Sequence, residues 1–372
     1  MKNRNSVYKN KKKITLYILT ASLAAITLLV GIGNCLTCNT QNTIAASDPV
    51  TTEDMPFITC EGPVEAYELS MPVTARWQEN TWVDNVLMHD KTDGEDYFKR
   101  KVFDIPIKRQ EVLSVTFLDE IPEVSVRTWD VSADKSGRVV AWVEKNGSMY
   151  DLYIAANGGI NAAGNACVRL FDNYCNMERI TFNGAFHTDY AEDMTGMFSA
   201  CFKLKYLDIS ELNTANVVNM NRMFACLPLE TIDLSTLDTS KVTDMTEMFA
   251  DCYNLVGLDL SSFDTGAVVT MRSMFQHSEN LVTVNMDGWD TSNVKDMNSM
   301  FSGCASLNYL DLTGFDTSKV VDMECMFYGC DALQILELGN WEVDSVLYMG
   351  DFYSKNNLPD GRPWTTLFWN NN

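Results

Sequence analysis

The sequence is poor in the side chains that catalytic and metal centres use most often. It holds three histidines in 372 residues, and His89, His187 and His277 lie far apart along the chain. It contains no G-x-S-x-G, no H-E-x-x-H and no phosphate-binding loop. These absences argue against a histidine-rich metal site and against a serine–histidine–aspartate triad. We therefore expect a non-enzymatic protein without a cofactor.

Positive charge is also scarce. Lysine and arginine number 28 against 50 aspartates and glutamates, which gives a formal net charge of −22. A surface so negative repels phosphate backbones, which excludes nucleic acid as a partner. With 46% hydrophobic residues the chain can still bury a large core, so it is not globally disordered.

Several of the few bases stand together at the N-terminus, in a segment over 1–13 that precedes an uncharged apolar stretch over 14–33. As a helix this stretch would span about 30 Å, the thickness of a bilayer's hydrocarbon core. Lysines in front of it predict a cytoplasmic N-terminus and an exported body. A cleaved signal peptide and an uncleaved transmembrane anchor both fit, whereas a lipid anchor on Cys35 is disfavoured by Asn34, where a small residue is needed. We expect a surface or extracellular protein of a Gram-positive type of bacterium, either membrane-anchored or secreted.

The rest of the chain divides by composition. Residues 34–56 are polar and predict a linker. Residues 57–165 carry β-branched and aromatic runs, such as Val112–Leu118 and Gly137–Val143, between turn signals such as Asn146-Gly147. We expect a small, mostly β domain there, a repeat region over 166–353 and a C-terminal tail over 354–372.

The repeat region is marked by the dipeptide Met-Phe, which recurs six times at spacings of 26, 25, 26, 26 and 26 residues. The copies begin at Met197, Met223, Met248, Met274, Met300 and Met326. The short spacing arises because Phe224–Leu229 lacks one residue that Phe249–Leu255 has. Degenerate units stand at both ends, as a stacked array needs in order to close.

Each unit has three parts. An L-x-x-L-x-L run, such as Leu307–Leu312, predicts a short strand with one buried face. A turn follows, and then a run such as Val320–Cys330, whose apolar residues at i, i+3, i+4 and i+7 predict one side of a short helix. Stacking the units buries these apolar sides, so we expect an α/β repeat solenoid with a parallel strand ribbon on one face and helical turns on the other.

The unit also resembles the BspA-type leucine-rich repeat of bacterial surface proteins. The resemblance covers about 130–353. It rests on the pattern Leu307, Leu310, Asp311, Leu312, Phe315, Asp316, Thr317, Val320, Asp322, Met323, Met326, Phe327 and Cys330. It implies a right-handed leucine-rich-repeat solenoid on an exported protein, with adhesion or protein binding as its role, and it supplies no catalytic residues.

Outward positions of the ribbon are the candidate binding surface. An acidic column is formed by Asp208, Asp233, Asp259, Asp311 and Glu337, with Asn285 in the remaining unit. Carboxylates about 5 Å apart repel by about 0.8 kcal/mol per pair in water, so backbone donors, Ca²⁺ or a basic protein partner should offset the charge. Tyr206 and Tyr309 are candidate anchor residues, because aromatic side chains dominate interface energetics.

Eleven cysteines need a separate interpretation. Cys201, Cys226, Cys252, Cys304 and Cys330 share one column of the repeat, and Ser278 takes the remaining place. We expect thiols that fill a buried slot rather than a metal or redox ladder. Cys325 stands off this column, where we expect exposure, and Cys167 with Cys175 and Cys35 with Cys38 are candidate disulfides.

The function we predict is protein or glycoprotein binding at the cell surface, with host matrix or another cell as the source of the partner. Two alternatives stay open. One is a cell-envelope enzyme with its site in 57–165, and the other is a Ca²⁺-stabilised structural stalk.

Overall fold

The structure is a computed structural model that describes residues 101–102, 105–123, 128–133, 136–354, 358–359 and 361. All of them belong to one compact unit, which takes in residues 75–372. The predicted basic segment 1–13, apolar helix 14–33 and linker 34–56 lie outside the described residues. Among the residues that are described, no helix is both long and apolar enough to cross a bilayer.

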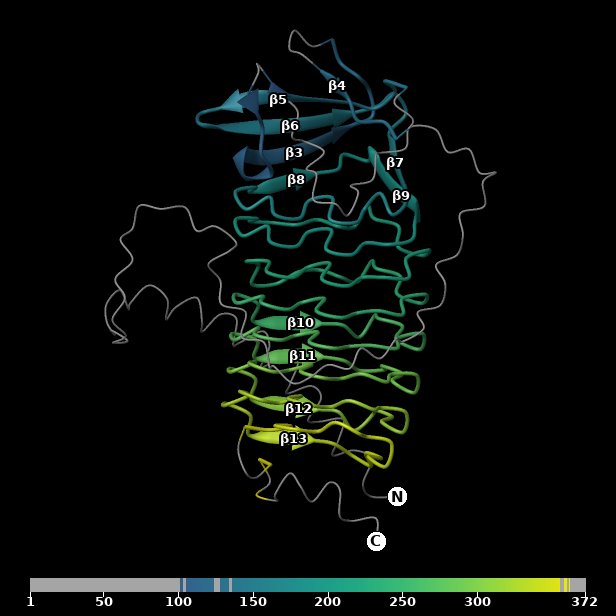
Figure 1. Cartoon of the computed structure of the whole chain (residues 1–372), viewed down its shortest axis with the longest axis vertical. Coiled ribbons are helices and arrows are strands. Elements are labelled where there is room, and N and C mark those ends of the chain that lie inside the picture. Colours follow the sequence, from purple (N-terminus) through teal and green to yellow (C-terminus); the bar gives the residue numbers. More distant parts are fainter. Residues whose placement is uncertain are drawn as a thin grey trace, which may run out of the picture. The chain divides into compact units, whose positions relative to one another are not determined.

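A five-stranded sheet forms the first part of this unit (Figure 1). Its strands lie in the order β4, β5, β6, β3, β8, with bounds Trp129–Asp130, Val140–Asn146, Met149–Ala155, Val112–Leu118 and Arg179–Thr181. β5 and β6 form an antiparallel hairpin that turns at Gly147, whose φ of +64° suits glycine. β3 runs parallel to both β6 and β8. Since β8 belongs to the degenerate first unit, the sheet leads directly into the repeats.

Smaller elements flank this sheet. β1 (Lys101–Val102) pairs with β2 (Ile105–Pro106), and a single 3-10 turn, η1, covers Arg109–Glu111. β7 (Ile160–Gly164) runs parallel to β9 (Phe186–Ala191). Inside, the ring of Phe117 packs against those of Phe171, Phe182 and Phe186, which joins the sheet and the first repeats in one core.

The repeats then lie one above another, as Figure 1 shows between β8 and β13. Their strands pair parallel and in register, β10 (Gly257–Asp259) with β11 (Thr283–Asn285) and β12 (Tyr309–Asp311) with β13 (Ile335–Glu337). The rings of the repeated Met-Phe dipeptides are buried and stack between 5.3 and 5.9 Å apart. The methionines beside them are also buried, so one core runs through all the repeats.

The predicted α/β leucine-rich-repeat solenoid is wrong for the residues that the structure describes. They contain no α-helix, and the repeat strands form small separate two-stranded sheets instead of one ribbon. The runs expected to be helical, such as Val320–Cys330, are series of turns. The class is therefore almost entirely β and turn.

Backbone conformation explains why these runs are not helical. Arg222 and Cys226 have φ values of +55° and +60°, and the same two places are left-handed in the following repeats. An α-helix of L-residues does not tolerate such residues. The N–H groups of Met220, Arg222 and Phe224 donate instead to carbonyls of the next repeat, at 2.9 to 3.0 Å. Every third or fourth side chain is still buried, which imitates a helical period in the sequence.

These left-handed places give a paired prediction. Ala200 has a φ of +56°, so Ala200→Gly should stabilise the protein by about 1 kcal/mol, because glycine adopts this conformation without steric cost. Gly303→Ala should destabilise it, since φ is +74° and an added Cβ would lie 2.6 Å from Cδ2 of His277. Urea unfolding of both variants measures the change in the free energy of unfolding. A change of the same sign in both variants would contradict the left-handed conformation of these two residues.

Candidate binding groove

The pairing of successive strand segments breaks between the first two full repeats. Lys205 donates its N–H to the carbonyl of Glu178 at 3.1 Å, and Val256 donates to that of Glu230 at 3.0 Å. Between 204–210 and 229–236, all of which the structure describes, no backbone hydrogen bond is formed. Main-chain groups that face each other there are left without the partner that a β-ladder provides.

Pro228 lies beside this break, but its missing N–H does not by itself cause it, because Asn254 and Asn280 hold the same place without a main-chain bond from their N–H groups and their repeats still pair with the repeat before. Ser306 and Ala332 hold the same place in later repeats and donate their N–H groups to Glu279 and Ala305 of the repeat before, at 3.0 and 3.1 Å. Proline has no N–H to donate, so the equivalent bond cannot form at residue 228. The same repeat is also one residue short. β11 and β12 are unpaired as well, but the bond from Ser306 still ties those two repeats together.

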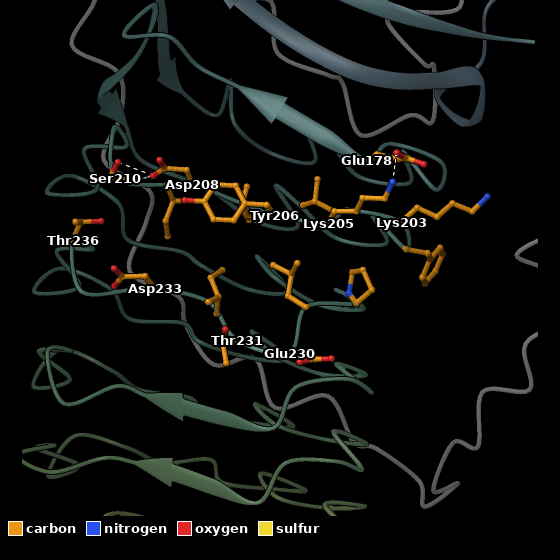
Figure 2. A pocket seen from close by; sticks show the side chains of 17 residues that line it. Glu178, Lys203, Lys205, Tyr206, Asp208, Ser210, Glu230, Thr231, Asp233 and Thr236 are labelled. Carbon is orange, nitrogen blue, oxygen red and sulfur yellow. Dashed lines mark hydrogen bonds and ion pairs between the residues drawn. The ribbon is translucent and has the colours of Figure 1, made fainter. Parts of the chain in front are cut away.

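The break opens a groove of about 760 Å³ on the strand side of the repeats. Figure 2 shows Lys203 and Lys205 at one end, Asp208 and Asp233 at the other, and Tyr206 between them. Lys205 forms an ion pair with Glu178, so its charge is neutralised within the chain. Buried leucine and isoleucine side chains of both segments line the floor. The groove thus combines an apolar floor with a polar rim of uneven charge.

The two carboxylates at the acidic end are held in place by local hydrogen bonds. Oδ1 of Asp208 accepts the N–H and the hydroxyl of Ser210 at 3.0 and 2.7 Å, and Asp233 accepts the same pair from Ser235. The Ser210 hydroxyl and N–H lower the pKa of Asp208, and the Ser235 N–H and hydroxyl lower that of Asp233. Both groups are exposed and ionised at neutral pH. Their Oδ2 atoms have no hydrogen-bond partner in the described structure and remain available to a ligand.

The predicted surface residues all lie outward, but the groove gathers only three of them. Tyr206, Asp208 and Asp233 line it. The other four predicted residues lie on later repeats, away from the groove: Asp259, Tyr309, Asp311 and Glu337. Ser261 and Thr313 donate to Asp259 and Asp311 as Ser210 does to Asp208, so backbone and hydroxyl donors offset part of the column's charge.

Sequence reasoning missed Pro228 and Glu178 as parts of this site. The sequence did contain a signal. The one spacing of 25 residues falls in the same repeat as Pro228, and no other L-x-x-L-x-L run contains a proline or directly follows one. Within the described residues no group of three or more histidine, cysteine or carboxylate side chains is placed to hold a metal ion.

The cysteine column is structural. Four thiols donate to main-chain carbonyls of phenylalanines in earlier repeats at 3.1 to 3.2 Å, and Ser278 does so at 2.8 Å. These thiols are Cys201, Cys252, Cys304 and Cys330. Burial raises the pKa of Cys201, Cys252 and Cys304, which keeps these thiols protonated and unreactive.

Three expectations about cysteine need correction. Cys226 does not belong to the column: it takes the left-handed place that Asp251 and His277 occupy in later repeats, and Leu227 fills the buried slot instead. Cys325 is buried, not exposed. Cys167 and Cys175 are both free thiols, while Cys35 and Cys38 lie outside the described residues.

On the turn side, a second series of acids is partly buried. Asp296 accepts the N–H of Asn298 at 2.9 Å, and Arg272 Nη1 lies 3.9 Å from Oδ2 of both Asp296 and Asp322. Burial raises the pKa of Asp296 to about 6, despite the Asn298 N–H and Arg272, and the charges of Asp322 and Asp244 add to the shift. This carboxylate therefore destabilises the fold when it is ionised.

Comparison with known proteins gives one family. The sequence profile of the family described as Mycoplasma protein of unknown function, DUF285, matches residues 165–258 and again residues 253–360, which together make up more than half of the chain. No curated protein and no solved structure matches.

The partly buried acid gives a pH prediction. Because the pKa of Asp296 is raised above its unfolded value, its contribution to stability increases as pH falls through about 6 and is lost as pH rises. Asp296→Asn should therefore stabilise the protein by about 2–3 kcal/mol at pH 8 and by little at pH 4. Urea unfolding across this range measures it, and the exposed Asp290→Asn is a control of opposite sign, because the Ser292 N–H and hydroxyl lower the pKa of Asp290 and its ionised form stabilises the fold. A gain that does not depend on pH would contradict the assignment.

Proposed function

Because the chain belongs to the family described as Mycoplasma protein of unknown function, DUF285, which brings no activity with it, we propose a function from its own residues. The protein is an exported, non-enzymatic surface protein, and the strand side of its repeats binds another protein or glycoprotein. The groove between the first two repeats is the observation that carries this proposal.

Two features of the strand side support binding there. On the turn side, alternate main-chain N–H groups bond to the next repeat and those between them bond within the turn, and the side chains of the Met-Phe dipeptides are buried in the core. On the strand side the ladder is interrupted, and Tyr206 leaves 69% of its surface exposed beside the groove. An exposed aromatic next to a hollow with an apolar floor is typical of a protein-binding hot spot.

Export is supported by the sequence. The basic segment 1–13 and the apolar stretch 14–33 have the pattern of a signal peptide or signal-anchor. The resemblance of the repeats to those of BspA-type bacterial surface proteins points the same way. A strongly acidic, protein-binding body outside the cell is consistent with both.

The binding side can be tested with two tyrosines. Tyr206→Ala should weaken capture of a partner from envelope and matrix proteins about tenfold, because it removes the exposed ring at the groove. Tyr328→Ala is the matched control, since Tyr328 is 50% exposed but lies on the turn side. The measurement is a quantitative pull-down with the purified chain. The proposal would be refuted if the unsubstituted chain captured no protein, or if the two substitutions weakened capture equally.

Localisation needs its own experiment. Protease added to intact cells should cleave the repeats if the body is exported, and the fragments can be followed with an antibody to the C-terminal repeats. A cytoplasmic protein expressed in the same cells serves as control. Full protection of the repeats in intact cells, followed by cleavage after lysis, would contradict export.

A further inference from the structure

We infer that the groove receives an extended, basic segment of the partner, with an arginine or lysine side chain seated between the carboxylates of Asp208 and Asp233. This inference rests on the proposed function, because it names the chemistry of the partner for the same site. The occupant is a polypeptide in extended conformation, and its cationic side chain is the specific contact.

Charge at the acidic end of the groove is the first argument. Asp208 and Asp233 lie in the same place of adjacent repeats, and each has one oxygen engaged by a serine and the other left without a hydrogen bond. Neither carboxylate forms an ion pair within the described residues. Lys205, which also lines the groove, is paired with Glu178 instead. Two uncompensated carboxylates side by side match the forked guanidinium of arginine, or the ammonium group of lysine.

The exposed ring beside these acids is the second argument. Tyr206 lies between the lysine end and the acidic end of the groove in Figure 2. A tyrosine face can cover the aliphatic stem of a basic side chain and attract its cationic head. The same ring explains why the site should prefer a basic side chain to a small inorganic cation.

The interrupted ladder is the third argument and indicates the conformation of the ligand. In later repeats, such as β10 with β11, main-chain groups of neighbouring segments pair with each other. In the groove, the segments 204–210 and 229–236 lack this pairing, and residues of both segments line the hollow. An extended peptide offers matching groups at a similar spacing, and this is how sheet edges commonly bind peptides.

Labelled heptapeptides test this inference directly. They alternate threonine and alanine and differ only in the fourth residue, which is arginine, its neutral isostere citrulline, or glutamate. With the full-length chain, fluorescence anisotropy should show about tenfold weaker binding for citrulline than for arginine, and weaker still for glutamate. Affinity for the arginine peptide should fall as salt is raised.

Variants of the chain locate the site. The double substitution Asp208→Asn and Asp233→Asn should lower the affinity of the chain for the arginine peptide to its affinity for the citrulline peptide. Asparagine keeps the oxygen that accepts from serine, so the turns are retained, and equal thermal unfolding midpoints confirm it. Asp311→Asn is the matched control, because Thr313 holds Asp311 in the same way outside the groove, and it should change nothing.

The outcomes separate this inference from the proposed function. If the chain captures a protein partner but does not distinguish arginine from citrulline, or responds equally to Asp311→Asn, the inference is wrong and the function stands. Capture that a glycosidase abolishes would also overturn it, because the ligand would then be a glycan. Failure to capture any partner refutes the proposed function itself.

Discussion

The structure depends on main-chain hydrogen bonds that run from each repeat to the next along the turn side. Met245 donates to Thr270, Met271 to Asp296, and so on through the stack, at 2.9 to 3.1 Å. Alternate N–H groups point along the stack, and those between them bond locally within the turn. A single repeat therefore leaves half of these donors unsatisfied and its methionine and phenylalanine side chains exposed. Stability comes only from stacking, as in other repeat proteins.

This constraint divides the molecule into a uniform side and a variable side. The turn side must repeat faithfully, since alternate N–H groups there bond to the next repeat and the phenylalanine rings stack on those one repeat away. The strand side is held by short, separate pairs such as β12 with β13, so a hollow can open at the shortened repeat without disturbing the core. Even at the break, the rings of Phe198 and Phe224 stay stacked at 5.9 Å. A binding site can thus form on the strand side without loss of the stacked core.

Electrostatics follow the same division. On the strand side, serine and threonine donors keep aspartates such as Asp208 ionised and facing outward. On the turn side, Asp296 is partly buried, which raises its pKa, and it accepts the N–H of Asn298 within a tight turn. Asp251 accepts from Tyr253 of its own repeat at 3.0 Å and lies 3.3 Å from Nδ1 of His277 in the next repeat. The hydrogen bond to Asp251 raises the pKa of His277, and burial only partly opposes it.

The sequence by itself determined the repeat length, the buried methionine and phenylalanine core, the buried thiol slot and the outward place of the acidic column. These follow from spacing and polarity, which are properties of the chain alone. Only the tertiary structure decided that Val320–Cys330 and its counterparts are turns, because residues buried at helical spacing do not reveal whether their N–H groups bond within the segment or to a neighbour. It also decided that Cys226 leaves its column and that a groove opens beside Pro228. Both depend on how a shortened repeat realigns against the next one, and such a contact between distant residues leaves no periodic trace in the sequence.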